Sequence, residues 1–393
     1  MDKLVLKKEQ TAALSKKAKY KVPFGTVSVT KDSLKLIQEA LASKWLTRGK
    51  FVQQFEEKFA DIFGIKEAIA VSSGTDAVAI CVAALYDFGA NRGDEVIVPA
   101  LSFVATGNAV LQAGLKPIFV DVKRETLNID PEKIEDCITK KTRAILVVHL
   151  MGKPVDMDRI QKIARKYRLM VIEDTAEAHG AKYNGQMCGT IGDMAAFSLY
   201  AAHIITSIEG GMIITNNPKI AHAARSLRNH GIEGKFRFKR IGFSAKMNEL
   251  EAAVGLGNVR IFEKILGKRR ENLLYLIKKF EKFQDYFITL KEDKGEKIGP
   301  HAFSVFVRED AGFTKDQFVV YLDQKGIDSR NLFYSMPTQT ESYSFLGYKE
   351  GDFPEAEFCS DHGTHIGIHQ DLNLKHMDYI AEVVENFIQH KKQ

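Results

Sequence analysis

The segment AILVVHLMGKPVDMDRIQKIARKYRLMVIE, residues 144–173, decides the fold class. It begins and ends with short runs rich in valine and isoleucine, Ala144–His149 and Met170–Glu173, which are typical of buried strands. Between them, apolar residues recur at spacings of three and four, which indicates one face of a helix. These residues are Met157, Ile160, Ile163, Ala164 and Tyr167. Strands that are buried on both faces and separated by helices indicate a mostly parallel α/β sheet.

The same alternation of strands and helices extends toward the N-terminus. Glu95–Pro99 and Pro117–Val122 are further strand-like runs, and a helical pattern begins at Thr30. Residues 26–250 are therefore predicted to form a large α/β domain. Residues 1–25 are rich in lysine and are predicted to form an N-terminal arm.

The pattern changes after about Met247. A helical segment rich in lysine and glutamate runs toward Lys282 and is predicted to link two domains. It is followed by a strand-like run, Ala302–Val307, and by a closing amphipathic helix. The apolar face of that helix consists of Met377, Ile380, Val384, Phe387 and Ile388. Residues 251–393 are therefore predicted to form the linking helix and a smaller C-terminal α+β domain.

Composition and charge restrict the class of protein. Hydrophobic residues make up 45% of the 393 residues and charged residues 27%, which is ordinary for a globular protein and excludes disorder as the main state. The formal net charge of +6 suits anionic ligands but is small for a chain of this length that binds nucleic acid. We therefore expect no nucleic-acid partner.

Neither a membrane span nor a metal cluster is expected. No apolar run reaches the roughly 18 residues that a spanning helix needs, and the N-terminus lacks the apolar core of a signal peptide. We therefore expect a cytoplasmic protein with no membrane partner. No CxxC pair occurs, so the sequence predicts neither a disulfide framework nor a zinc or iron–sulfur site. The scattered cysteines are Cys81, Cys137, Cys188 and Cys359.

Small polar residues, Ser72–Asp76, lie between a strand-like run and an almost wholly apolar helix. Backbone N–H groups at a helix N-terminus have no partner within the helix, and the helix dipole favours an anion there. This segment is therefore either a phosphate cradle or a plain N-cap, for which serine and threonine are preferred.

Further candidate residues follow other strands of the predicted sheet. Phe103 follows EVIVPALS and could stack on a planar ring, although a lone aromatic residue is more often part of a core. Asp174 ends another strand, where its carboxylate could hold a protonated ring nitrogen or cap the next segment. Ser198 and His203 lie in the segment 197–211. Because these pieces occur at successive strand ends, we expect them to lie at one edge of the sheet.

Taken together, the chain resembles the DegT/StrS-like family of nucleotide-sugar aminotransferases and dehydratases. The resemblance covers nearly the whole chain and implies the aspartate aminotransferase fold (fold type I) with pyridoxal 5′-phosphate (PLP) or pyridoxamine 5′-phosphate (PMP) as cofactor. It is carried by WLTRG (45–49), SSGTDA (72–77), GDEVIVPALSF (93–103), IEDTAEAHGA (172–181), GTIGDMAAFSLY (189–200), EGGMIITNN (209–217) and GIDSR (326–330).

The resemblance implies roles for individual residues. Gly74, Thr75 and Ser198 would bind the cofactor phosphate. The pyridine ring would contact Phe103 by stacking, Asp174 at its nitrogen and Glu177 near its hydroxyl. The sugar nucleotide would face Thr47 and Arg330. Ser244 replaces the family's asparagine that reaches the neighbouring subunit's phosphate, and Lys246 replaces an arginine.

The main departure from the family concerns the lysine that its aminotransferases link covalently to the cofactor. That position, six residues before the glutamate of EGG, is His203. An imidazole cannot form this link, but it can give and take protons near neutral pH. The family's 3-dehydratases carry the same replacement, which predicts His203 as the catalytic acid and base. However, Ala202 stands where the dehydratases have a serine beside their histidine. Much of the sequence is also similar to the perosamine-synthase type of aminotransferase.

Three functions therefore stay open at this point. The first is 3-dehydration of a nucleotide-linked 4-keto-6-deoxyhexose, with glutamate as the amino donor. The second is a sugar 4-aminotransferase whose lysine has been replaced. The third is a non-catalytic relative that binds a sugar nucleotide. The resemblance also implies a homodimer with shared active sites.

Overall fold

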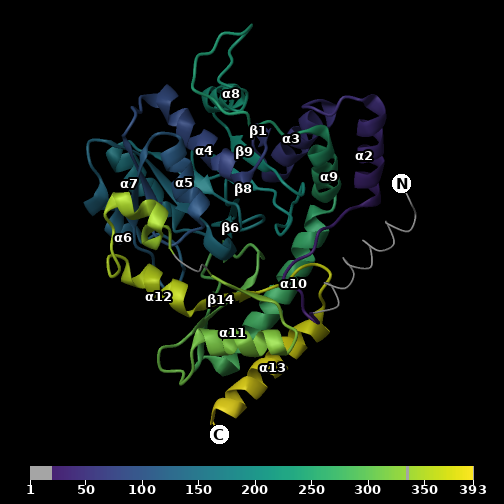
Figure 1. Ribbon diagram of the computed structural model, residues 1–393, viewed down its shortest axis with the longest axis vertical. Coiled ribbons are helices and arrows are strands. Elements are labelled where there is room, and N and C mark those ends of the chain that lie inside the picture. Colours follow the sequence, from purple (N-terminus) through teal and green to yellow (C-terminus); the bar gives the residue numbers. More distant parts are fainter. Residues whose placement is uncertain (1–19, 333–335, 393) are drawn as a thin grey trace.

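A computed structural model of the chain (Figure 1) describes residues 20–332 and 336–392. The predicted N-terminal arm therefore lies mostly outside the described residues. At its end, the Val22 N–H donates to the carbonyl of Gly326 (3.0 Å). None of the helices in these ranges is both long and apolar enough to cross a membrane.

A seven-stranded sheet forms the centre of the larger part of the molecule. Its strands lie in the order β1–β9–β8–β5–β4–β2–β3, and only β9 runs antiparallel to its neighbours. This arrangement confirms the predicted, mostly parallel α/β sheet. The strands are β1 (Glu67–Val71), β2 (Glu95–Pro99), β3 (Lys116–Val120), β4 (Thr142–Val148), β5 (Met170–Asp174), β8 (Met194–Ser198) and β9 (Gly211–Thr215).

Helices cover both faces of this sheet because successive strand residues point to opposite faces. In β2, Val96 and Val98 pack in the same cluster as apolar residues of α4, α5 and α8, whereas Ile97 packs with α7 on the other face. Two more helices, α3 and α9, pack against the β1–β9–β8 end. The bounds are α3 (Lys50–Phe63), α4 (Gly74–Ala84), α5 (Val104–Gln112), α7 (Met157–Tyr167), α8 (Pro218–Leu227) and α9 (Glu249–Val259).

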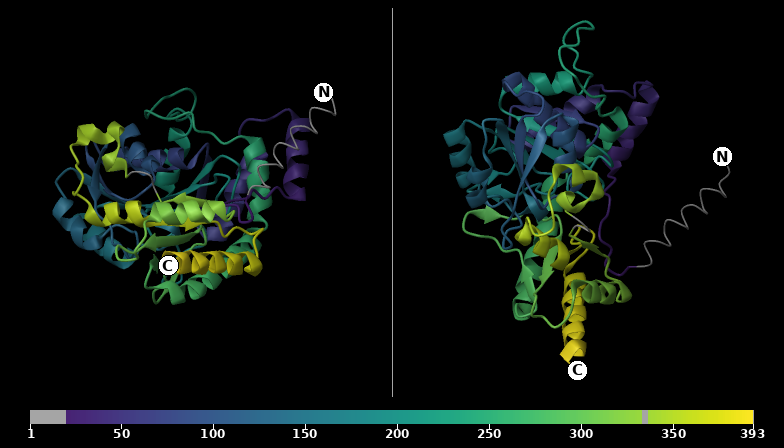
Figure 2. Two further views of the ribbon diagram at one scale, coloured as in Figure 1. Left: turned by 60° about the horizontal axis from the view of Figure 1, so that its bottom comes forward. Right: turned by 60° about the vertical axis from the view of Figure 1, so that its left-hand side comes forward.

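A second, antiparallel sheet forms the lower part of the molecule in Figure 1, with order β10–β12–β14–β13. Its strands are β10 (Phe287–Thr289), β12 (Phe303–Val307), β13 (Ser329–Asn331) and β14 (Gly363–Ile366). Helices α10 (Phe262–Phe280), α11 (Lys315–Gln324), α12 (Pro354–His362) and α13 (Leu374–Lys392) lie around it (Figure 2). The division of the chain at residue 250 stays a prediction.

The segment that was expected as one linking helix consists of two helices. Asn248 caps α9 through a capping box, and the chain turns at Arg260 and Ile261 before α10 begins. The reason is packing, because α9 lies against α2 (Lys31–Ser43) and α3 whereas α10 lies against α13.

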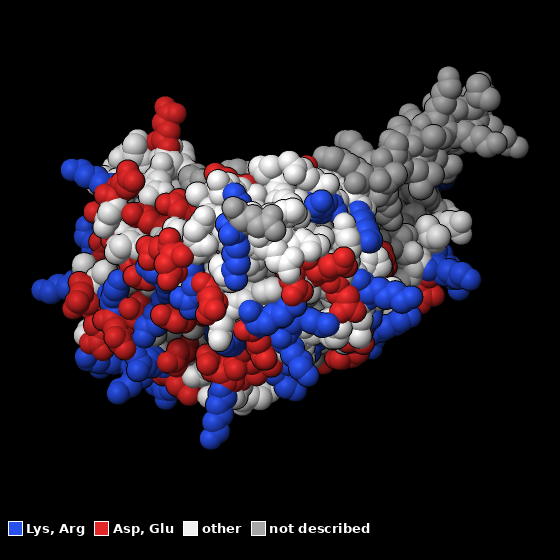
Figure 3. Space-filling model, turned by 90° about the horizontal axis from the view of Figure 1, so that it is seen from below, with Lys and Arg blue, Asp and Glu red and all other residues white. Residues whose placement is uncertain are grey.

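The two parts are joined by further contacts. Strand β11 (Glu296–Lys297) pairs with β6 (Lys182–Tyr183), which also pairs with β7 (Gln186–Met187). The Gly299 N–H donates to the carbonyl of Gly152 (2.9 Å). At the face seen in Figure 3, basic and acidic side chains are interspersed, in keeping with the small net charge.

Candidate active site

A cavity of about 460 Å³ opens at the carboxyl ends of the parallel strands. Ligands of open α/β sheets bind at this edge, because the strand ends and the following helix N-termini converge there. The cavity is lined by Gly74, Thr75, Phe103, Asp174, Glu177, Ser198 and His203, together with other residues. Seven of the predicted site residues, from four separate segments, are thus brought together.

The first turn of α4 forms one end of the cavity. Ser73 is its N-cap: the Oγ accepts from the N–H of Asp76 (3.0 Å), which confirms the N-cap interpretation. The N–H groups of Gly74 and Thr75 lie in the first turn, where helix geometry offers no intrahelical acceptor. The Ser198 side chain lies next to this turn. The N-cap therefore coexists with backbone donors on residues that line the cavity.

Gly74 permits the close approach of β8 to α4. A Cβ atom on Gly74 would lie 2.6 Å from the Cβ of Ser198 and 3.0 Å from its Cα. We expect Gly74→Ala to lower the free energy of unfolding by about 1–3 kcal/mol, because backbone must move to relieve the overlap. Calorimetric unfolding measures this change. A matched control is Gly267→Ala in α10, where a Cβ meets nothing within 4 Å and the variant should be at least as stable as the native chain.

Asp174, at the end of β5, is buried and faces the cavity. Its Oδ2 accepts from the hydroxyl of Thr106 and its Oδ1 accepts from the N–H of Ala176, both at 3.1 Å. Burial raises the pKa of this carboxyl above its ordinary value. A cationic group in the cavity would restore the ionised form.

Glu177 is held by the turn that follows β4. Its Oε2 accepts from the N–H of Met151 (2.8 Å), whose φ of 52° turns the backbone toward the carboxylate. Burial and the neighbouring charge of Asp174 raise the pKa of Glu177 to about 7. Its Oε1 lies 3.7 Å from the Nε2 of His301. The carboxyl group therefore changes its protonation state near neutral pH.

His203 forms another part of the wall. Burial and the charge of Arg269 lower its pKa to about 3, so the imidazole is neutral at pH 7. The buried Nδ1 has no hydrogen-bond partner among the described residues. Arg269, itself buried, donates to the carbonyls of Ala202 (3.4 Å) and His203 (3.5 Å). The guanidinium thus fixes the backbone that carries His203.

Phe103 lies at the start of α5, and 61% of its surface is exposed where it lines the cavity. This exposure overturns the interpretation of Phe103 as a core residue. Three other predicted residues do not line the cavity. Thr47 is exposed between α2 and α3, Arg330 lies on β13 of the second sheet, and Ser244 is exposed and bridges to Asn229.

Sequence reasoning missed several residues of the cavity wall. Thr106, Glu209 and His301 line it, and none was singled out. Thr106 lies three residues after Phe103, the end of the motif GDEVIVPALSF, so its nearness to the cavity could have been predicted from that motif. His301 lies in GPHAF, before β12, where a single histidine has no motif around it.

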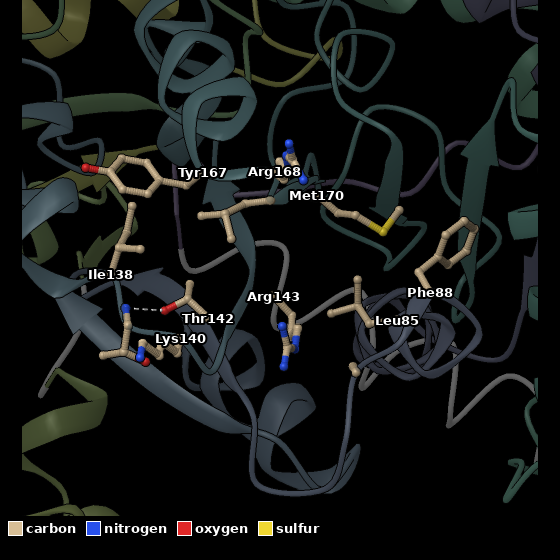
Figure 4. A pocket seen from close by; sticks show the side chains of 12 residues that line it. Leu85, Phe88, Ile138, Lys140, Thr142, Arg143, Tyr167, Arg168 and Met170 are labelled. Carbon is tan, nitrogen blue, oxygen red and sulfur yellow. Dashed lines mark hydrogen bonds between the residues drawn. The ribbon is translucent and has the colours of Figure 1, made fainter.

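A second cavity, of about 300 Å³, lies at the opposite edge of the sheet (Figure 4). Thr142 and Met170, the first residues of β4 and β5, line it together with Arg143 and Arg168. None of the predicted site residues lines this cavity.

The site around the first cavity suits a PLP-type cofactor. Neutral donors at a helix N-terminus suit a phosphate. A buried carboxyl whose pKa is raised suits a protonated ring nitrogen, and an exposed aromatic face suits a planar ring. No lysine or arginine among the described residues lines the cavity. In that part of the chain, no three His, Cys, Asp or Glu side chains are arranged to hold a metal ion.

The fold and this site define a PLP-dependent enzyme of fold type I. The model of the DegT/DnrJ/EryC1/StrS aminotransferase family matches residues 27–385, and the chain belongs to this family.

The chain is 35% identical over 358 residues to GDP-perosamine synthase of Caulobacter vibrioides, covering 90% of this chain and 94% of that protein. It is 32% identical over 391 residues to GDP-4-keto-6-deoxy-D-mannose 3-dehydratase of Escherichia coli O55:H7, covering 93% and 100%. A solved GDP-4-keto-6-deoxymannose-3-dehydratase with a trapped PLP–glutamate geminal diamine matches with a TM-score of 0.86 at 31% identity, covering 92% and 99%. These findings confirm the predicted family, fold, enzyme class and cofactor.

Proposed function

We propose that the chain catalyses PMP-dependent 3-dehydration of a nucleotide-linked 4-keto-6-deoxyhexose, with His203 as the acid and base. The observation that carries this proposal is a neutral histidine in the cavity wall, where no lysine of the described residues is present. The similarity to a 3-dehydratase over 93% of the chain supports it.

In this proposal, the cofactor is held without a covalent link to the protein. The N–H groups of Gly74 and Thr75 and the hydroxyl of Ser198 bind the phosphate. Phe103 stacks on the ring, and Asp174 accepts a charge-assisted hydrogen bond from the ring nitrogen. When bound, PMP supplies a primary amine for the sugar ketone and a conjugated ring that takes up the electron pair of a broken C–H bond.

His203 moves the proton. Because the imidazole is neutral at pH 7, it has one basic nitrogen that can accept a proton from carbon. The same proton can then leave with the hydroxyl group from carbon 3 as water. Arg269 holds the carbonyls of residues 202 and 203, and therefore keeps the imidazole in one place during both transfers. Glutamate is proposed to restore the amine, supported by the dehydratase relative that holds PLP joined to glutamate.

The proposed substrate contacts are Arg330 and Thr47, which lie outside the single-chain cavity. We propose that a second copy of the chain completes the site. The loop of residues 232–241 projects beside α8 (Figure 1) and exposes three apolar side chains among basic ones, namely Phe236 (84%), Phe238 (62%) and Ile241 (85%). Ser244 and Lys246, which follow the loop, would supply the donor and the positive charge that the cavity lacks.

We expect Ile241→Asp to weaken dimerisation by at least about tenfold, because a charge would be buried in the apolar contact. Sedimentation at several protein concentrations measures the dissociation constant. The matched control is Val320→Asp on α11, where Val320 is 56% exposed outside the proposed interface. A native chain that sediments as a monomer, or two variants with equal dissociation constants, would contradict the proposed dimer contact.

Mass spectrometry of the reaction product tests the function. The full chain is incubated with PLP, glutamate and a panel of nucleotide-linked 4-keto-6-deoxyhexoses that begins with GDP-4-keto-6-deoxymannose. We expect a product that has lost one oxygen at carbon 3. A product with a new amine would instead assign a 4-aminotransferase. An unchanged substrate throughout the panel would contradict both activities.

A further inference from the structure

His301 is the only described residue after position 250 that lines the first cavity. Its side chain is 8% exposed, and it lies immediately before β12 of the second sheet. None of the roles proposed above uses it. The question is therefore what a buried imidazole from the second sheet does beside His203 and Glu177.

The position of His301 is fixed by the same turn that holds Glu177. The turn that holds Glu177 through Met151 N–H also docks the segment before His301, since Gly299 N–H donates to the Gly152 carbonyl at 2.9 Å. A Cβ on Gly152 would lie 2.0 Å from the Gly299 carbonyl oxygen. This docking leaves little room for movement.

Arg269 connects His301 with His203. The guanidinium donates to the His301 carbonyl (3.5 Å) as well as to the carbonyl of His203 (3.5 Å). The two imidazole rings lie with their centroids 5.2 Å apart and their planes at 40°, whereas the His179 ring lies 5.8 Å from that of His203. The His301 ring is thus the nearer of these two rings to that of His203, whose Nδ1 has no hydrogen-bond partner among the described residues.

The Nε2 atom of the His301 ring faces Glu177. It lies 3.7 Å from Oε1 of that carboxyl group. A neutral imidazole has one N–H donor and one acceptor, so the nitrogen facing Glu177 and the nitrogen facing away have opposite roles. Hydrogen bonds in an unliganded active site are often long and shorten when ligands bind.

We propose that His301 is a positioning residue that relays the ionisation of Glu177 to the Nδ1 of His203 and so selects the tautomer in which His203 accepts a proton. This inference rests on the proposed function for its catalytic consequence. When Glu177 is ionised, His301 donates to it and presents a lone pair to His203. The His203 Nδ1 then carries the hydrogen, and its Nε2 is the free base.

When Glu177 is protonated, the relay is reversed. The carboxyl donates to His301, which donates to His203, so that Nδ1 becomes the acceptor and Nε2 carries the hydrogen. The two states differ by one proton: when Glu177 ionises, its proton passes to His301, the hydrogen of His301 passes to Nδ1 of His203, and the hydrogen on Nε2 of His203 leaves to solvent. The charged and titratable groups that face His301 and Glu177 are Asp174, His179, His203, Arg269 and His365.

The sign of the pH dependence follows from Glu177. Burial and Asp174 hold the pKa of its carboxyl at about 7, so it is protonated below that pH and ionised above it. Burial first, and then the neighbouring histidines and Arg269, lower the pKa of His301, which keeps its imidazole neutral in this range. The base form of His203 is therefore expected to decrease as the pH falls through about 7.

Selective ¹⁵N labelling of histidine in the full-length chain tests the relay without any reaction. Long-range ¹H–¹⁵N spectra report which ring nitrogen carries the hydrogen, and the His203 signal is assigned as the one lost in His203→Asn. We expect the His203 tautomer to change near pH 7 in the native chain. The change should be absent in His301→Phe and largely restored in His301→Gln, which keeps a donor and an acceptor.

Two further variants are measured in the same way: Glu177→Gln, which removes the titrating group, and His222→Phe, which is the matched control. Glu177→Gln should abolish the pH-dependent change without altering His301. His222, on α8, forms an exposed pair with Glu233 (2.6 Å) outside the cavity, and its variant should behave as the native chain does. A His203 tautomer that is independent of pH in the native chain, or unchanged by His301→Phe, would overturn the relay.

The turnover assay separates this inference from the proposed function. We expect His301→Phe to lower kcat roughly 100-fold with little change in KM, and to remove the step near pH 7 from the pH profile. If the native chain shows the tautomer change but no dehydration, the relay stands and the function fails. If dehydration is observed and the tautomer change is not, the function stands and the relay fails.

Discussion

His203→Asn is expected to lower kcat for dehydration by about 10²- to 10⁴-fold while the cofactor stays bound. Asparagine is similar in size to the imidazole but has no basic nitrogen, so it cannot accept a proton from carbon. The proposed phosphate and ring contacts come from other segments and are untouched. Product formation is measured by mass spectrometry, and cofactor binding by absorbance.

The matched control for this variant is His362→Asn. His362 ends α12, where its Nδ1 is hydrogen-bonded to the carbonyl of Val307 (2.8 Å), and it does not line the cavity. This variant should retain native turnover. Native turnover in His203→Asn would remove His203 from the reaction, and loss of the cofactor would assign it a binding role instead.

His203→Lys separates the two proposed chemistries. If the chain is a dehydratase, the substitution replaces the neutral imidazole that moves the proton, so the loss of oxygen from carbon 3 of the sugar should cease. In an aminotransferase whose lysine has been replaced, the same variant should form a product with a new amine. Failure of His203→Lys to form that product would count against the aminotransferase.

Much of the fold could be predicted because burial follows the local pattern of the sequence. β2 spans Glu95–Pro99 and α7 spans Met157–Tyr167, as their apolar residues indicated. Seven of the predicted site residues also assembled at one edge, since the carboxyl ends of parallel strands converge. Asp174 and Phe103 are far apart in the chain but line one cavity, because their strands β5 and β2 both lie beside β4.

The remaining features depend on contacts between distant segments. His301 meets Glu177 only because the Gly299 segment docks on Gly152, and no local signal in GPHAF indicates this contact. The break between α9 and α10 contains neither proline nor glycine at residues 260 and 261. Its cause is the change of packing partner, which a single sequence does not display.

Asp174→Asn is the second substitution for which we expect a large effect. Burial raises the pKa of the Asp174 carboxyl, so its negative charge is costly unless a cation pairs with it. A protonated ring nitrogen would be that cation, and the ionised carboxylate would in turn stabilise the ring's positive charge. The amide oxygen of asparagine can still accept from the Ala176 N–H, and its NH2 group can donate to the Thr106 hydroxyl, but the side chain carries no charge. We expect kcat to fall about 10²- to 10³-fold.

The same variant has a consequence at Glu177. The negative charge of Asp174 contributes to the raised pKa of Glu177, so its removal should lower that pKa below about 7. The His203 tautomer change observed by NMR should then move to lower pH. This shift is measurable in the cofactor-free protein and does not depend on the reaction.

Asp94→Asn is the matched control, because Asp94 is also buried but lies at the amino edge of the sheet, where Arg143 donates to it (2.6 Å). Removing its charge should lower stability while leaving the cofactor absorbance and the tautomer midpoint unchanged. Equal losses of kcat in the two variants would show that any buried carboxyl has this effect. A loss confined to Asp174→Asn would require a cationic partner inside the cavity, which among the described residues the chain itself does not provide.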